Sequence, residues 1–172
     1  MRTASLLIAH VAGLVSGRLI LHPTEPIAGR RAAAMAGGPG FVGSWRMTVF
    51  EAEGPPTLAL ATLGADGTAV IAEHPVVTPP FAPGVVFTSG GHGAWMASGP
   101  TTANLTYVGL GSYGEGVLFG TATARSSITL SADGQTFGGE VVWDLADPKG
   151  YPLASYQGRF QATRIVAEAP VR

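Results

Sequence analysis

The fold is decided by the stretch PTLALATLGADGTAVIAEH, which spans residues 56–74. Two mainly apolar runs flank the tripeptide Ala65-Asp66-Gly67. An Asp-Gly pair tolerates the positive φ angles of a tight hairpin, so it joins strands readily. The stretch therefore predicts two short antiparallel strands, over 56–63 and 68–74.

Further turn signals follow this hairpin along the chain. Ala132-Asp133-Gly134 and Asp147-Pro148-Lys149-Gly150 are two further turns, in which glycine or proline supplies the required backbone angles. The remaining predicted strands cover 43–51, 92–98, 101–110, 115–130, 136–145 and 153–166. Only the connection 74–91 is long, and its four prolines forbid regular pairing across most of it, although a short extra strand fits at 85–88.

Eight strands joined mainly by short turns predict an all-β protein. We expect an eight-stranded antiparallel up-and-down barrel, because closure removes the exposed edges that an open sheet must protect. A two-sheet β-sandwich is the alternative. The chain has 172 residues, 46% of them hydrophobic, which suits one core. We therefore expect one barrel domain over 41–168, preceded by an N-terminal extension over 1–40.

The charge pattern excludes one class of partner. Only 12% of the residues are charged, the net charge is -1, and Lys149 is the single lysine. A nucleic-acid-binding protein usually carries a basic stripe, so we expect no nucleic-acid partner. The absence of cysteine excludes disulfides and thiolate chemistry and leaves the redox compartment open.

The N-terminal extension has three interpretations. An apolar run over 4–15 follows Arg2 and has the length of a signal-peptide core, but it is too short to span a bilayer. It could instead form a helix that packs on the barrel, and translation from Met35 would remove it altogether. Cytoplasmic and secreted locations both remain open.

The two ends of the predicted domain carry a recognisable pair of features. Gly43-Ser44-Trp45 opens the first strand and Arg164 lies near the end of the last. This pair resembles the signature of the calycin superfamily of lipocalin-like barrels. The resemblance covers about residues 43–166 and implies that Trp45 seals one end of the barrel beneath a stacked Arg164. The chain departs from classical lipocalins because it lacks their Thr-Asp-Tyr-type second motif and any disulfide.

Two residues are candidate catalysts. Glu51 shares a strand face with Trp45, Met47 and Val49, and on the inner face it would lie toward the open mouth, where a carboxylate can accept a proton. His92 follows the long loop, and a histidine titrates near neutral pH. The alternatives are a solvated Glu51 and a His92 that is bonded to backbone.

Five further residues are candidate ligand contacts, since they are large or polar and lie within predicted strands. They are Met47, Trp95, Asn104, Trp143 and Tyr156. Asn104 would act as a polar anchor if it faced inward. Alternation places His92 and Trp95 on opposite faces of one strand, so they are not expected to line the same cavity.

Two motif matches carry no chemistry. The segment 109–114, GLGSYG, fits the dinucleotide-binding pattern, but a strand follows it where a helix would have to hold the pyrophosphate. A metal site would need ligands from separate strands, with no spacing to indicate it. We therefore expect no cofactor and no metal.

The sequence favours binding of a small hydrophobic or amphipathic molecule inside the barrel, since the chain is apolar and weakly charged. A cofactor-independent isomerase or cyclase that uses His92 or Glu51 for proton transfer is the first alternative. The second is a filled, structural barrel that forms a homo-oligomer.

Overall fold

The computed structural model describes residues 39–51, 54–77 and 84–170. The interpretations of residues 1–38 therefore lie outside the described residues. A 3-10 turn, η1 (Pro39–Phe41), leads into ten strands. Their bounds are β1 (Gly43–Glu51), β2 (Thr57–Leu63), β3 (Thr68–Ala72), β4 (Val76–Val77), β5 (Val86–Thr88), β6 (Gly91–Ala97), β7 (Thr102–Tyr113), β8 (Leu118–Leu130), β9 (Thr136–Ala146) and β10 (Pro152–Arg164).

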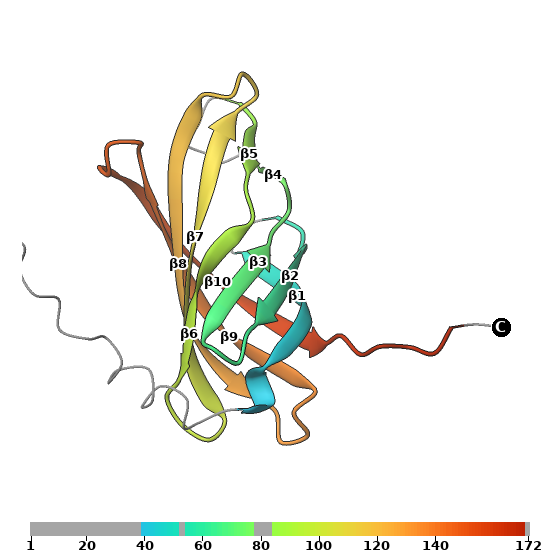
Figure 1. Cartoon of the computed structure of the whole chain (residues 1–172). Helices are drawn as coiled ribbons and strands as arrows, with labels where there is room; N and C mark the ends of the chain where they lie inside the picture. The colour runs from blue at the N-terminus through green and yellow to red at the C-terminus, as the bar shows by residue number, and fades with distance from the viewer. Residues whose placement is uncertain (1–38, 52–53, 78–83, 171–172) are drawn as a thin grey trace, which may run out of the picture.

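Eight of these strands close into a barrel (Figure 1). The ring runs β1-β2-β3-β6-β7-β8-β9-β10, and β10 pairs with β1 again. Every neighbouring pair is antiparallel. The predicted barrel is thus confirmed, and the sandwich is not the fold because the hydrogen-bonded ring is continuous.

The turns that punctuate the sequence have the expected backbone. Gly67, Gly134 and Gly150 have φ angles of 85°, 69° and 89°, which L side chains rarely adopt. Asp66, two residues before Thr68, accepts a hydrogen bond from the Thr68 backbone N–H at 3.0 Å and so fixes the first of these turns.

The long connection contains more structure than its prolines predicted. The extra strand expected near 85–88 is present as β5, and it pairs with β4, a two-residue strand that the sequence did not reveal. β5 also pairs with the end of β7, where Val86 lies opposite Tyr113. Because β5 and β8 hold both edges there, β7 continues to Tyr113 instead of ending near residue 110.

The closed end of the barrel is sealed by aromatic rings. Trp45 is fully buried, and its Nε1 donates to the Phe41 carbonyl at 3.0 Å. Phe137 packs edge-on against it with centroids 4.6 Å apart. The Arg164 guanidinium carbon lies 4.1 Å from the Trp45 ring centroid, and the same side chain donates to the carbonyls of Gly134 and Val42.

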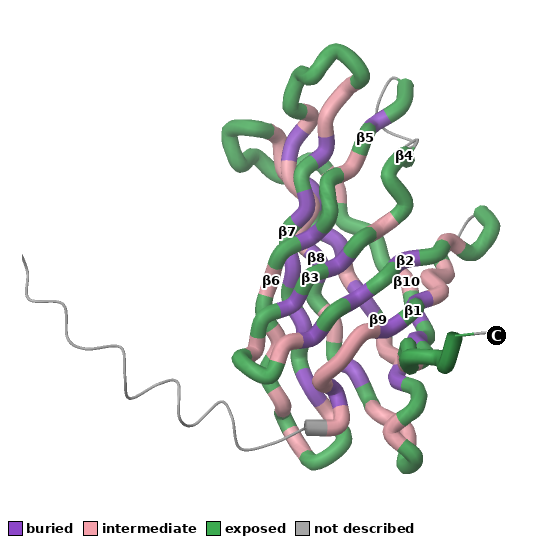
Figure 2. The backbone as a smooth tube through the Cα atoms, turned by 45° about the vertical axis from the view of Figure 1, so that its right-hand side comes forward, coloured by how far each residue is buried: buried purple, intermediate pink, exposed green. Residues whose placement is uncertain are grey.

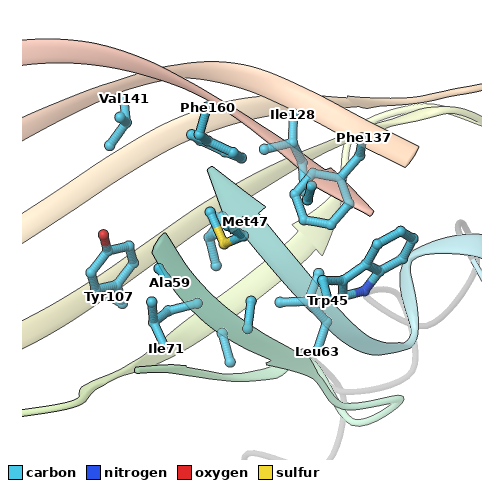
Figure 3. Close-up of a cluster of buried hydrophobic side chains, with 14 of the residues drawn as sticks. Trp45, Met47, Ala59, Leu63, Ile71, Tyr107, Ile128, Phe137, Val141 and Phe160 are labelled. Carbon is cyan, nitrogen blue, oxygen red and sulfur yellow. The ribbon is translucent and has the colours of Figure 1, made fainter. Parts of the chain in front are cut away.

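Apolar side chains fill the barrel above this seal. Figure 3 shows Trp45 at one end of the buried cluster and Tyr107 at the other, with Met47 between them. Alternate residues along each strand point inward, which gives the repeating buried and exposed positions in Figure 2. In the described part of the chain, no helix has the length and apolar character needed to cross a bilayer.

Candidate functional site at the open end of the barrel

The end opposite Trp45 is built from strands of unequal length. Pairing of β1 with β10 is described as far as Glu51 and Gly158, and residues 152–157 of β10 have no partner on that side among the described residues. β7, β8, β9 and β10 are the long strands, and they continue past the short β1, β2, β3 and β6 (Figure 1). At this end the inner face of β10 is partly exposed at Tyr156, whereas Trp143 and Leu145 on the inner face of β9 are buried.

A polar network occupies the inner face where β3 ends. Glu73 follows β3 directly and keeps the inward position of the alternation that runs through Ile71. The Tyr107 hydroxyl, from β7, donates a hydrogen bond to the Glu73 carboxylate. Trp143, from β9, donates through Nε1 to the Tyr107 oxygen at 3.3 Å. Both aromatic rings are 6% exposed, so the network is set into the apolar interior.

Burial changes the acidity of this network. Loss of solvent raises the pKa of Glu73 above its ordinary value of 4.5, the hydrogen bonds from Tyr107 and Trp143 oppose that change, and the nearby Glu51 carboxylate adds to it. The pKa of Tyr107 is raised by the same burial and by Glu73. Tyr107 is consequently protonated near neutral pH, where its hydroxyl serves as a hydrogen-bond donor.

A second aromatic residue extends the site toward solvent. Tyr156, from β10, stacks on Trp143 with centroids 5.2 Å apart and an interplanar angle of 20°. Its ring is 37% exposed. Burial first, and then the charges of Glu51 and Glu73, raise the pKa of Tyr156 to about 12. The carboxylates of Glu51 and Glu73 therefore both lie close enough to Tyr156 to influence its hydroxyl group electrostatically.

Glycines make room for these rings. A Cβ on Gly91 would lie 2.5 Å from Cδ2 of Tyr107, and one on Gly158 would lie 2.9 Å from the Trp143 ring. Both glycines stand at inward positions of strands, where a side chain would displace the ring beside it. Because glycine has no side chain, these two positions leave space for the rings of Tyr107 and Trp143.

The candidate residues that face inward fall into three groups. Glu51, Trp143 and Tyr156 come together at the open end. Met47 is buried in the middle of the barrel. Trp95 points inward but contacts Phe41 and donates to the Gly64 carbonyl at 2.8 Å, which places it at the closed end.

His92 and Asn104 are not brought to the interior. Both are exposed on the outer face, where His92 lies opposite Val108 and Asn104 opposite Met96. The inward orientation considered for Asn104 is therefore corrected, and His92, a candidate catalyst in the sequence, does not face the barrel interior. Neither residue belongs to the site at the open end.

Sequence reasoning missed Glu73 and Tyr107 as functional partners. The two lie 34 positions apart, and nothing local to either marks the contact. One signal was present: Ala69, Ile71 and Glu73 share the parity of a single strand face, so the acidic residue continues a buried stripe.

Two hollows lie at the surface of the described part of the chain. One of about 660 Å³ lies over β7, β8 and β9 and includes Asn104, Arg125 and Glu140. The other, of about 630 Å³, lies between β5 and the β7–β8 turn and includes Phe87 and Tyr113. Neither contains the Glu73 network. Among the described residues, no three His, Asp or Glu side chains are grouped to hold a metal ion.

The hydrogen-bonded ring defines the class of protein as a closed eight-stranded antiparallel β-barrel. No protein-family model matches the chain, and no curated protein matches it. Among solved structures, a redesigned β-barrel is similar, with 15% identity and a TM-score of 0.40 over 79% of this chain and 96% of that one.

Proposed function

We propose that the open end of the barrel binds a small amphipathic molecule. Its apolar part would pack on Trp143 and Tyr156, and its polar end would meet Glu73 and Glu51. One observation carries the proposal: the hydrogen-bonded Glu73 network lies beside an aromatic stack in which Trp143 is buried and Tyr156 is partly exposed, in an otherwise apolar interior. A few placed polar groups within an apolar, aromatic surface are typical of small-molecule sites.

The charges at this end select the polar group of the ligand. Arg46, Arg125 and Arg159 stand at outward strand positions, and Arg164 lies at the closed end. The described inward positions around Glu73 hold only acidic or neutral groups. A carboxylate pair attracts a cation and accepts hydrogen bonds, and an aromatic face favours a cation as well. We therefore expect an amine or another hydrogen-bond donor at the polar end.

The filled lower barrel limits how deeply a ligand can enter. Phe160, Val141 and Met47 are each at most 3% exposed and lie between the network and the aromatic seal. A ligand that kept this packing would occupy the level of Tyr156 and Trp143. This favours a molecule with a short apolar body, or one whose tail remains partly outside the barrel.

The binding test uses three probes that have the same alkyl chain. Dodecylamine, dodecanol and dodecanoate differ mainly in head-group charge, and tryptophan fluorescence reports binding, since Trp143 lies in the site. We expect the amine to bind best and the carboxylate worst. Glu73→Gln and Glu51→Gln should each reduce the preference for the amine, whereas Glu140→Gln, on the outer face of β9, should leave it unchanged. Equal binding of all three probes by the unmodified protein would contradict the proposed head-group chemistry.

A second function is favoured by the raised pKa of Glu73. A carboxyl group that holds its proton closer to neutral pH can act as a general acid and, once ionised, as a base. A cofactor-independent isomerase or cyclase would use this group to move a proton between two atoms of one substrate. Exchange of deuterium from solvent into a bound carbonyl compound tests it, and Glu73→Gln should abolish the exchange. Binding without any exchange would leave the carrier function alone.

Membership of the calycin superfamily is proposed as well. It is supported by Gly43-Ser44-Trp45 at the start of β1 and by the stacking of Arg164 from β10 on Trp45. A solved structure of a calycin that superimposes on this barrel with the same strand order and the same Trp–Arg contact would test this relationship.

A further inference from the structure

One side of the barrel differs from the other in charge. The strands β2, β3, β6 and β7 contain no Asp, Glu, Lys or Arg. Each of the strands β1, β8, β9 and β10 contains at least one. The four uncharged strands are consecutive in the ring, so their outer face forms one surface, which we call the uncharged wall.

The uncharged wall is apolar as well as uncharged. Its large exposed side chains are Leu58, Leu60, Val70, Met96, Val108 and Leu110, with exposed fractions between 41% and 64%. The register makes them one surface: Val70 lies opposite His92, and His92 lies opposite Val108. Arg46 beside Leu60 and Arg125 beside Thr106 mark the two borders.

The size of the wall fits a protein interface. Four strands about 4.8 Å apart and about seven residues long cover roughly 20 Å by 25 Å, or about 500 Å² before the relief of the side chains is counted. The largest connected apolar patch on a typical soluble monomer covers about 300–600 Å², so the wall lies at the upper end of that range. Stable dimers bury about 800 Å² per partner and weaker ones bury less, so the area of the wall suits a weak dimer.

We propose that the uncharged wall is the surface through which two copies of this chain form a symmetric dimer. In a two-fold contact the same surface patch of both copies comes together, so a patch with a net charge would face an identical charge and be repelled. A wall without Asp, Glu, Lys or Arg avoids this repulsion as long as His92, which lies on the wall, is neutral. A partner chosen by charge complementarity would find no charge to pair with here.

The side chains of the wall also suit self-association. The side chains of Thr106 and Asn104 both donate and accept hydrogen bonds, so identical residues can bond across a two-fold axis. Their exposed apolar neighbours supply the area that leaves water. This inference is independent of the proposed ligand, because the wall lies outside the barrel and Glu73 lies inside it.

The first experiment measures the mass of the full chain in solution. The monomer has a mass of 17.5 kDa, and we expect the mass from sedimentation equilibrium to approach twice that value as the protein concentration rises. Val70→Lys places a like charge in the middle of both faces and should weaken dimerisation at least about tenfold. Gln161→Lys, an exposed and outward position on β10, adds the same charge on the other side and should have no effect.

A second variant keeps the test valid if the lysine disturbs the fold. The chain has no cysteine, so Val70→Cys introduces a single thiol, and we expect the dimer to protect it from maleimide until dilution. A chain that is monomeric at every soluble concentration would overturn the proposal. So would a dimer that Val70→Lys and Gln161→Lys affect equally. If the Val70→Cys thiol is protected in a monomer and loses this protection when residues 1–38 are removed, the wall binds that segment instead of a second copy. If the thiol is protected only in the presence of lipid vesicles, the wall binds a membrane instead.

Discussion

The Tyr107 hydroxyl donates to the Glu73 carboxylate and accepts from the Trp143 indole at 3.3 Å. Three elements of the barrel, β7, the end of β3 and β9, are thereby joined across its interior. Each of these polar groups would otherwise lie without a partner among apolar side chains, which is costly. The network thus stabilises the open end and also holds the Glu73 carboxyl group in a fixed place.

Tyr107→Phe should destabilise the barrel by about 1–3 kcal/mol, because Trp143 loses its acceptor and Glu73 loses a donor. The hydrogen bond from Tyr107 lowers the pKa of Glu73, so its removal should raise that pKa further. Urea unfolding measures the first effect, and NMR titration of the Glu73 carboxyl carbon measures the second. A Glu73 pKa that fell in the variant would contradict the hydrogen bond.

Glu73→Gln should change how stability depends on pH. The folded pKa of Glu73 lies above its ordinary value of 4.5. The stability contributed by the protonated group is therefore complete below 4.5 and is lost as the pH rises through the raised folded pKa. Because the glutamine amide does not ionise, the variant should gain stability relative to the unmodified protein across that window. Unfolding free energies between about pH 4 and pH 8 measure it, and a constant difference would be inconsistent with a raised pKa.

Arg164→Met should cost about 2–4 kcal/mol, since it removes the stacking on Trp45 and the donors to the carbonyls of Val42 and Gly134. Arg159→Met is the matched control. Arg159 also lies over a ring, that of Phe50 at 5.3 Å, but on the exposed outer face. We expect the control to cost less than about 0.5 kcal/mol. Equal losses of thermal stability in the two variants would show that the contact of Arg164 with Trp45 stabilises the barrel no more than an exposed contact does.

Gly91→Ala should destabilise the open end by about 1–3 kcal/mol, because the new methyl group meets the Tyr107 ring. Gly109→Ala provides the comparison on the neighbouring strand. A Cβ there lies 3.9 Å from the Ser89 carbonyl, an ordinary contact, so the change should be nearly neutral. Near-identical melting temperatures for the two variants would show that Tyr107 has room to move.

Most of the fold could be predicted from the sequence because its turns are chemically explicit. Asp66-Gly67 and Asp133-Gly134 fix two hairpins locally, and the stacking expected of Trp45 and Arg164 is present at 4.1 Å. β4 escaped notice because a two-residue strand has no period of its own, and its pairing with β5 depends on where the barrel places both.

The site was harder to predict than the fold. Alternation along a strand shows which residues share a face, but it does not show which face is inside. His92 and Trp95 were correctly separated, yet only the closed ring shows that Trp95 is the inward one. The partnership of Glu73 and Tyr107 depends on the order of strands around the barrel, because β3 and β7 are both neighbours of β6.

The central claim is that ligands bind at the open end, and the three tryptophans allow one direct measurement. Trp45 and Trp95 donate their indole N–H to backbone carbonyls at the closed end, whereas Trp143 donates to Tyr107 in the site. In a ¹⁵N-resolved NMR titration with dodecylamine, we predict that the Trp143 indole signal shifts and saturates while those of Trp45 and Trp95 stay in place. Saturable binding that leaves the Trp143 signal unmoved, or that moves Trp45 and Trp95 instead, would contradict the account.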